Sequence, residues 1–291
     1  MNTYPSTVVN RPPARVQIVT DSASDILPTH AQALGIILVP NRVVLDGAAR
    51  RDGVDLTAAQ FYAALQSAKS LPYTLPAPPQ DLYTAYQYAF RHGATEVVSI
   101  HVSGRLSQVV EHAMAARSAL PGAPIVVIDS NQAGIGMWPS VIHAAQLARM
   151  GASAREIEES VRAVLHRTRL YFMVESLEYL RRGGRIGRAR EMIGTLLDAH
   201  PILTLREGSV APVETARPRS RAMERLVDLA LQTGQVERLL LCGTGIELIS
   251  EMEEVLRPRY SGIVANTWLG PTLGANTGPG VAISVVVPPE G

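Results

Sequence analysis

Hydroxyl and carboxylate side chains follow three apolar runs in the first half of the chain. Thr20-Asp21-Ser22 comes after the first run, Ser103 with Ser107 after the second, and Asp129-Ser130 after the third. These side chains could hold a polar group, because ligands of doubly wound sheets lie beyond the carboxyl ends of the strands. Serine and aspartate also begin helices as local caps, which explains each strand end by itself. Three converging strand ends nevertheless predict a polar site, whose ligand these residues do not identify.

A glycine-rich turn and an arginine cluster could each contact a phosphate. Gly243-Thr244-Gly245 follows an apolar run and opens a helical stretch, where backbone N–H groups can hold an anion. The last glycine of the dinucleotide-binding pattern is missing, so cofactor binding there is not favoured. The arginine cluster fits an exposed helix end or a contact for a phosphate or an acidic partner, and both interpretations stay open. It consists of Arg181, Arg182, Arg185, Arg188 and Arg190.

Other catalytic chemistry finds no support in the residue pattern. The seven histidines lack the H-E-x-x-H spacing of metal ligands or a comparable one, and no G-x-S-x-G segment is present. The single cysteine, Cys242, excludes an intramolecular disulfide and a cysteine-based zinc site. It lies in an apolar run, which predicts a buried side chain rather than a nucleophile. The residues predict a polar site without recognisable catalytic machinery.

Strand and helix patterns alternate through the first half of the chain. The strands read as unbroken apolar runs, which is typical of buried parallel strands. Thr57 and Gln60 form a capping box for a helix to about Ala68, and the proline-rich segment 71–79 is expected to be an extended loop. We therefore expect a flexible tail over residues 1–15 and a parallel, doubly wound α/β domain over residues 16–165. Its strands are predicted at 16–20, 36–40, 96–102 and 125–128. Its helices are predicted in a stretch that ends at Leu34 and at 81–92, 106–120, 137–150 and 153–167.

The second half has a different pattern of apolar runs and turns, which predicts a mixed sheet. Apolar runs at 202–205 and 210–213 flank Glu207-Gly208, a hairpin signal that implies antiparallel pairing. A helix is expected to follow the glycine-rich turns as far as Asp198, and another to run from about Ser220 to Gln232. We expect residues 166–291 to form a second α/β domain.

Composition limits the class of protein. The 291 residues carry a formal net charge of +1, with 46% hydrophobic and 18% charged residues. This balance argues against nucleic-acid binding by phosphate attraction and against attachment to an anionic membrane. No apolar run approaches the roughly 20 residues of a membrane helix, and Met1–Arg15 contain no apolar signal core. We expect a soluble cytoplasmic protein that binds no nucleic acid and does not insert stably into a membrane.

Five ordered segments resemble the motifs of a known family. They are Thr20–Asp25, Ile128–Ser130, Leu177–Ile186, Pro201–Leu203 and Gly274–Gly280. These segments are similar to the T-D-S-x-x-D, I-D-S, L-x-x-L-x-x-G-G-R-I, K-P-I-L and G-x-H-x-G-P-G motifs of the DegV family of bacterial fatty-acid-binding proteins. The likeness extends over roughly residues 16–287.

The resemblance implies a fold and a function. It implies a two-domain α/β protein that holds one long-chain fatty acid in a tunnel between its domains. It also implies that the acid is presented to a fatty acid kinase, which converts the carboxylate to an acyl phosphate for phospholipid synthesis. The binding protein itself would catalyse nothing and would need no metal or cofactor.

The resemblance also implies the residues that would hold the head group. The family's S-x-x-L-S-G-T motif falls on residues 103–109, so Ser107 stands at the carboxylate-binding serine. The T-S-Q-P-S-P loop falls on residues 73–78, with Tyr73 at the threonine and Thr74 at the first serine. Asn276 replaces the family's histidine and is followed by Thr277; an asparagine can donate a hydrogen bond but carries no charge.

Two arginines are implied as contacts for a phosphate or a partner: Arg185 in the G-G-R-I motif and Arg217 after the predicted hairpin. Gln108, Val109, Tyr73 and Asn276 depart from the family pattern. We expect these departures to affect the choice of ligand or the coupling to a kinase rather than the fold.

Two alternatives stay open beside the carrier. The fold class is shared with dihydroxyacetone kinase-like proteins. The first alternative is therefore a phosphoryl-transfer or hydrolytic enzyme that uses Asp21, Ser22 and Asp129. Against it, the sequence shows no Mg²⁺-binding carboxylate cluster and no complete phosphate-binding loop. In the other alternative the bound lipid is structural or regulatory, and the segment from Arg181 to Arg190 is a docking surface.

Overall fold

The computed structural model describes residues 15–193, 199–232 and 234–289. A four-stranded parallel sheet organises the first half, in the order β2-β1-β6-β7. The predicted tail lies outside the described residues except for Arg15. The strands are β1 (Val16–Asp21), β2 (Ile37–Val39), β6 (Glu96–His101) and β7 (Ile125–Asp129).

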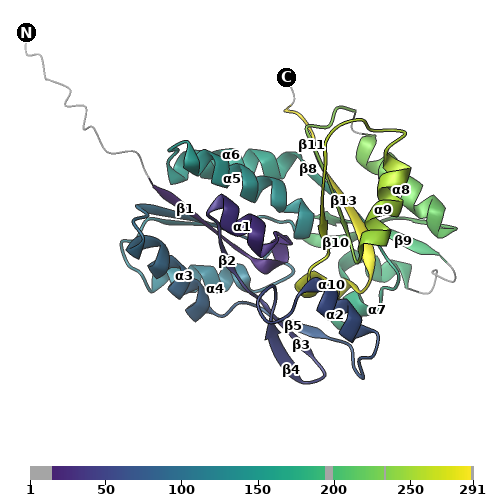
Figure 1. The fold of residues 1–291 in the computed structure, drawn as a ribbon, viewed down its shortest axis with the longest axis horizontal. Helices are drawn as coiled ribbons and strands as arrows, with labels where there is room; N and C mark the ends of the chain where they lie inside the picture. Colours follow the sequence, from purple (N-terminus) through teal and green to yellow (C-terminus); the bar gives the residue numbers. More distant parts are fainter. Residues whose placement is uncertain (1–14, 194–198, 233, 290–291) are drawn as a thin grey trace, which may run out of the picture.

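Helices cover both faces of this sheet because its strands are apolar on both faces. Ile18 and Val98 pack beneath one helical layer, whereas their neighbours Val19 and Val97 pack beneath the other. Figure 1 shows α5 and α6 on one side of β1, and α3 and α4 on the other. The doubly wound arrangement is the one predicted from the sequence. The helices are α1 (Pro28–Leu34), α3 (Pro79–Arg91), α4 (Val109–Ser118), α5 (Trp138–Arg149) and α6 (Ala154–Arg167), with short 3₁₀ turns η1 (Ser22–Ser24) and η2 (Gly134–Gly136).

A small antiparallel sheet, in the order β4-β3-β5, is inserted after β2. It contains β3 (Arg42–Leu45), β4 (Ala48–Arg51) and β5 (Tyr73–Leu75), and α2 (Ala58–Leu65) follows β4 with the predicted Thr57–Gln60 capping box. The prediction that residues 71–79 are entirely loop is wrong for β5. The three residues between Pro72 and Pro76 carry backbone N–H groups, which proline lacks. They can therefore pair with β3, about thirty positions earlier in the chain.

A six-stranded mixed sheet organises the second half, in the order β10-β9-β8-β13-β11-β12. Only the pair β11–β12 is parallel. The predicted hairpin is confirmed: Glu207 and Gly208, both with positive φ, join β9 to β10. The strands are β8 (Thr168–Val174), β9 (His200–Arg206), β10 (Ser209–Ala216), β11 (Arg238–Gly243), β12 (Val264–Trp268) and β13 (Gly280–Val286).

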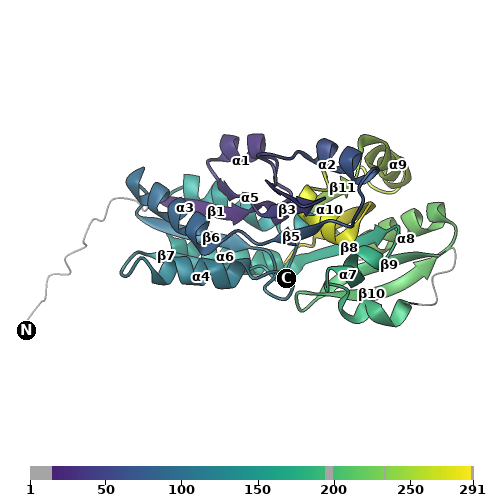
Figure 2. The ribbon, with the colours of Figure 1, turned by 90° about the horizontal axis from the view of Figure 1, so that it is seen from below.

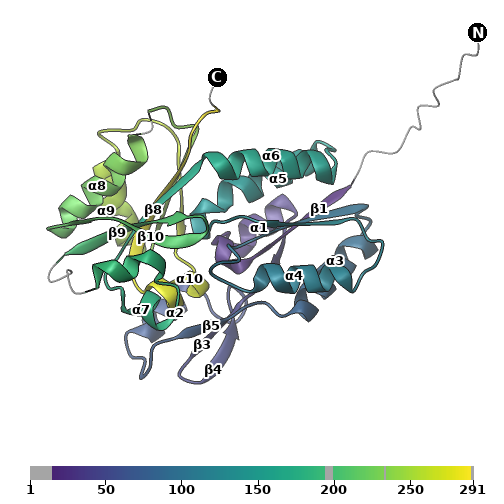
Figure 3. The ribbon, with the colours of Figure 1, turned by 180° about the vertical axis from the view of Figure 1, so that it is seen from behind.

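Helices α8 (Arg219–Leu231) and α9 (Ile246–Leu256) pack on one face of the mixed sheet. Its other face meets the first half, because Leu170, Leu240 and Cys242 share a core cluster with Ile18 and Trp138. Figures 2 and 3 show the two sheets side by side, with the small sheet β3–β5 beside α10 (Pro271–Thr277) at their junction. The domain boundary expected near residue 165 falls in the last turn of α6, which is followed directly by β8, and it stays a prediction.

The glycine-rich segment after β8 forms short helical turns rather than a long helix. They are α7 (Glu178–Arg182) and the 3₁₀ turn η3 (Gly187–Met192). The prediction of a helix to Asp198 is wrong for the segment to Met192, and residues 194–198 lie outside the described residues. None of the helices in the described part of the chain is long and apolar enough to cross a membrane.

Candidate ligand-binding site

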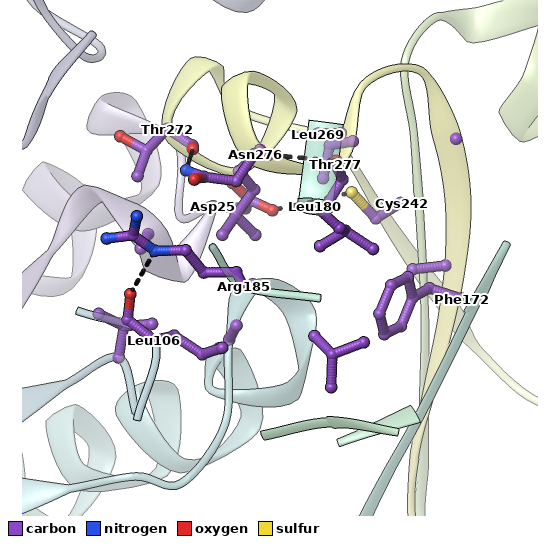
Figure 4. A pocket seen from close by; sticks show the side chains of 18 of the residues that line it. Asp25, Leu106, Phe172, Leu180, Arg185, Cys242, Leu269, Thr272, Asn276 and Thr277 are labelled. Carbon is purple, nitrogen blue, oxygen red and sulfur yellow. Dashed lines mark hydrogen bonds between the residues drawn. The ribbon is translucent and has the colours of Figure 1, made fainter. Parts of the chain in front are cut away.

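A pocket lies where the two halves of the molecule meet (Figure 4). It contains about 1010 Å³ of space free of protein atoms, part of which is open to solvent. Its walls are mostly apolar and come from both halves, and they include Leu106, Ile135, Leu170, Phe172, Leu180, Leu205, Leu273 and Val281.

A chain of contacts places several polar side chains together in this pocket. Asn276 donates through Nδ2 to Thr74 Oγ1 at 3.1 Å and to the carbonyl oxygen of Thr272 at 2.9 Å. Gly183 separates Asn276 from Arg185: a Cβ at this position would lie 2.9 Å from Asn276 Oδ1 and 3.8 Å from Arg185 Cδ. The absence of that side chain lets the two polar groups face the same space.

Arg185 links this group to the segment after β6. Its Nε donates to the carbonyl oxygen of Leu106 at 3.0 Å, and its Nη1 donates to the carbonyl oxygen of Gly183. Within the described ranges its Nη2 has no hydrogen-bond partner. Ser107, next to Leu106, is half-buried and lines the pocket, and its Oγ accepts a long hydrogen bond of 3.4 Å from Val109 N. The serine hydroxyl therefore keeps its proton for a ligand.

Strand alternation separates the two predicted residues of β5. Thr74 lines the pocket, whereas Tyr73 is 56% exposed and does not line it, because consecutive strand residues point to opposite faces. Thr277 lines the pocket, but its hydroxyl lies 3.1 Å from the carbonyl oxygen of Leu273 and 3.0 Å from that of Gly278. Arg217 is exposed between β10 and α8, outside the pocket lining. The structure thus brings Ser107, Thr74, Asn276, Thr277 and Arg185 together, and places Tyr73 and Arg217 elsewhere.

Two buried carboxyl groups fix the beginning of α10, the helix that carries Asn276. Asp25 Oδ1 accepts from Gly270 N at 3.0 Å, and Asp52 Oδ2 accepts from Thr272 N at 3.1 Å. Burial raises the pKa of Asp52 to about 6. Burial, followed by the negative charge of Asp52, raises the pKa of Asp25 well above its ordinary value. Neither role could be predicted from the sequence, since each partner is more than 200 positions away.

The polar residues at the strand ends mostly serve local structure. Asp21 accepts from the N–H groups of Ala23 and Val102, and Asp129 accepts from those of Gly104 and Asn131. These aspartates, together with Ser22, Ser103 and Ser130, are not among the residues that line the pocket. These side chains therefore act as caps and turn-formers, which was one of the two interpretations of the sequence. The strand ends contribute to the pocket through neighbouring residues instead, namely Ala23, Val102, Ser107 and Ala133.

A buried hydrogen-bonded row crosses the first sheet. Asp21 Oδ2 lies 2.9 Å from His101 Nδ1, His101 Nε2 lies 2.6 Å from Ser99 Oγ, and Tyr86 OH donates to Ser99 Oγ at 2.9 Å. Burial acts to raise the pKa of Asp21, but the hydrogen bond and charge of His101 outweigh it and hold the pKa below its ordinary value. All four side chains are buried and none lines the pocket, so the row stabilises the fold rather than meeting a substrate.

Asn41 connects this row to the pocket. Its Nδ2 donates to Asp21 Oδ1 at 3.0 Å, and its Oδ1 accepts from Ala77 N at 2.9 Å. Ala77 belongs to the loop that follows Thr74, so Asn41, itself a lining residue, holds this loop against the end of β1. Sequence analysis did not single out Asn41, because an asparagine after a short strand carries no distinctive signal.

The remaining candidates from the sequence have local explanations. Arg181 and Arg182 form ion pairs with Glu178 on α7. Cys242 is buried as predicted, but it also lines the pocket. Across the described residues, no group of three or more histidine, cysteine, aspartate or glutamate side chains could hold a metal ion.

Comparison with known proteins agrees with this geometry. The model of the DegV family, which is described as a family of uncharacterised proteins, matches residues 15–288. The chain belongs to the DegV family. A DegV domain-containing protein of Halalkalibacterium halodurans is 31% identical over 275 residues, which cover 91% of this chain and 96% of that protein. Another, of Deinococcus radiodurans, is 36% identical over 213 residues, or 73% of this chain and 75% of that protein.

Solved DegV structures share the whole architecture. A DegV family protein of Thermus thermophilus, described as binding a fatty acid, is 31% identical and superposes with a TM-score of 0.85 over 94% of this chain and 100% of that one. DegV of Bacillus subtilis, described as a fatty-acid-binding protein, is 27% identical, with a TM-score of 0.83 and the same coverage. The pairing of a parallel sheet with a mixed sheet is thus the DegV fold, and DegV proteins bind fatty acids.

Proposed function

We propose that this DegV protein binds one long-chain fatty acid in the pocket between its two sheets. The observation that carries the proposal is the composition of that pocket: mostly apolar walls, with hydroxyl, amide and guanidinium groups gathered around Arg185. A fatty acid combines a long apolar chain with one polar end, which matches this distribution of apolar and polar groups. The fatty acids bound by relatives of similar structure support the same ligand class.

The apolar walls would supply most of the affinity. Each buried CH₂ group contributes about 0.8 kcal/mol, so a long acyl chain gains more than the polar end can. The carboxylate must still be hydrogen-bonded, because an unpaired buried charge costs several kcal/mol. Ser107, Thr74 and Asn276 can donate to it, and the Arg185 guanidinium adds a charge-assisted donor. In this proposal Thr277 borders the head group and Tyr73 remains on the outer side of the small sheet.

We further propose that the protein is a cytoplasmic, non-catalytic carrier that presents the carboxylate to a fatty acid kinase. Part of the pocket is open to solvent, which supports exchange of a bound ligand with a partner. The exposed Arg217 and the half-buried Arg185 are the proposed contacts for the phosphate or the partner. The acyl phosphate would then enter phospholipid synthesis. The two halves joined near residue 165 are the proposed domains that enclose the ligand.

Native mass spectrometry of the purified protein, followed by extraction and analysis of the released lipid, tests the proposal. We expect one fatty acid per chain and exchange with an added fatty acid of different length. A ligand that leaves only on unfolding would instead identify a structural lipid. An empty protein that takes up no added fatty acid would contradict the proposed function, and turnover of a phosphate compound would favour an enzyme.

A further inference from the structure

The pocket contains a second polar region, away from the Arg185 group. Asp25 and Cys242 both line it and are 5% and 1% exposed. Asp25 follows η1 in the first half, and Cys242 lies on β11 in the second. Figure 4 shows the carboxyl and the thiol pointing toward one another. The apolar side chains of Leu180 and Leu269 line the pocket beside them (Figure 4), and Ile135 also lines it.

One oxygen of Asp25 lacks a strong partner. Oδ1 accepts from Gly270 N at 3.0 Å, whereas Oδ2 accepts a long contact of 3.9 Å from Cys242 Sγ, a weak donor. Gly134, another lining residue, leaves this oxygen uncovered: a Cβ at position 134 would lie 2.9 Å from Oδ2. A buried polar atom in such a position normally has a full hydrogen-bond partner.

Asp25 is suited to both donate and accept a hydrogen bond. Burial and the nearby charge of Asp52 raise its pKa, which favours the neutral, protonated carboxyl. Burial likewise raises the pKa of the Cys242 thiol. A protonated carboxyl beside a protonated thiol repels no uncharged ligand, and it offers an O–H donor and a carbonyl acceptor to a hydroxyl group.

Helix α10 sets the spacing between the two polar regions. Asp25 contacts the residue before its first turn, Gly270, and Asn276 lies near its end. Six residues of α-helix rise about 9 Å. An extended chain advances about 1.2 Å per bond, so this spacing corresponds to roughly seven or eight bonds of an acyl chain.

We propose that Asp25 and Cys242 form a second subsite that selects fatty acids with a hydroxyl group in the middle of the chain over unsubstituted ones. The proposal rests on the proposed fatty-acid-binding function. The carboxylate of such a ligand lies at Asn276 and Arg185, and its mid-chain hydroxyl exchanges hydrogen bonds with Asp25 Oδ2. Unsubstituted acids still bind, but they leave that oxygen without a strong partner.

Competition binding to the delipidated full-length protein tests this subsite. The probes are stearic acid and three hydroxystearic acids, with the hydroxyl near the carboxylate, in mid-chain or near the methyl end. We expect the mid-chain isomer to bind about two- to tenfold more tightly than stearic acid, the range of a single neutral hydrogen bond. Asp25→Leu should bind the mid-chain isomer and stearic acid with equal affinity. Asp25→Asn, whose amide can also donate and accept a hydrogen bond, should retain the preference for the mid-chain isomer.

A matched control separates this subsite from the head group. Ser107→Ala should lower the affinities for stearic acid and for the hydroxystearic acids by the same factor, so that the ratio of these affinities stays unchanged. Equal affinity of the wild-type protein for stearic acid and all three isomers would overturn the subsite while leaving the proposed function intact. Failure to bind any of the four would overturn the proposed function itself. The comparison of isomers uses the wild-type protein, so it holds even where an Asp25 variant does not fold.

Discussion

Replacing Asn276 with aspartate tests the placement of the ligand carboxylate most directly. Asn276→Asp keeps the shape of the side chain but exchanges its amide donor for a negative charge beside Thr74 and Arg185. Two unit charges about 4–5 Å apart at an effective dielectric constant near 20 repel by about 3–4 kcal/mol. Each 1.4 kcal/mol is a factor of ten. We therefore expect the affinity for a fatty acid to fall by about two to three orders of magnitude.

A neutral ligand distinguishes charge repulsion from a general disturbance. The affinity should be measured by displacement of a fluorescent fatty acid, for an acid and for the fatty alcohol of the same length. Asn276→Asp should strongly weaken the binding of the acid and hardly change the binding of the alcohol. Asn276→Ala, which removes the donor without adding a charge, should cost the acid roughly 1.5–3 kcal/mol. Equal losses for acid and alcohol in the Asp variant would refute the placement of the carboxylate at Asn276.

Four further measurements address the site and its support. Ser107→Ala should weaken fatty-acid binding by roughly 1–3 kcal/mol in the same displacement assay, and unchanged affinity would remove Ser107 from the site. Ala282→Phe places a ring in the pocket wall, so long acids should lose affinity while short acids retain it; parallel losses would contradict the position of the chain. Because the pKa of Asp52 rises to about 6 on folding, its contribution to stability should fall by about 3 kcal/mol as the pH rises from about 4 to above 6. Asp52→Asn should therefore have a flatter dependence of its melting temperature on pH, and identical curves would exclude this titration. His101→Leu leaves the Asp21 carboxylate buried without its closest partner, so urea denaturation should show a loss of about 3–5 kcal/mol, and a loss below 1 kcal/mol would show that the pair is dispensable.

Local patterns predicted much of the fold because short-range physics determines those elements. The Thr57–Gln60 capping box and the Glu207-Gly208 hairpin both form as expected, since their hydrogen bonds and backbone angles involve near neighbours. Strand β5 was missed because it forms only by pairing with β3, and the prolines on either side argue for a loop. The turn η3 was wrongly predicted as part of a longer helix, because the local effect of the glycines around it, which favour short turns, was underestimated.

The site was harder to predict, because its parts come together only in the folded chain. Ser107, Thr74 and Asn276 were identified by resemblance to DegV motifs, and the structure places all three on one pocket. Spacing in the sequence gives no sign that Asn276 and Thr74 are hydrogen-bonded across 202 positions. Nor does it show that Tyr73 faces away, since the direction of a strand residue depends on which face of its sheet is covered.

Asp25 shows why one residue can satisfy a local rule and still belong to the site. An aspartate after a strand is explained by a turn, and its backbone does adopt the left-handed conformation, with φ of 55°. The side chain, however, spans 245 positions to hold the first turn of α10 through Gly270. The oxygen not used for that purpose faces a pocket that an acyl chain is proposed to fill. Because one carboxyl both positions the helix of Asn276 and borders the proposed chain, Asp25→Leu should weaken the binding of every fatty acid and also remove the preference for the mid-chain isomer, whereas Asp25→Asn should keep both.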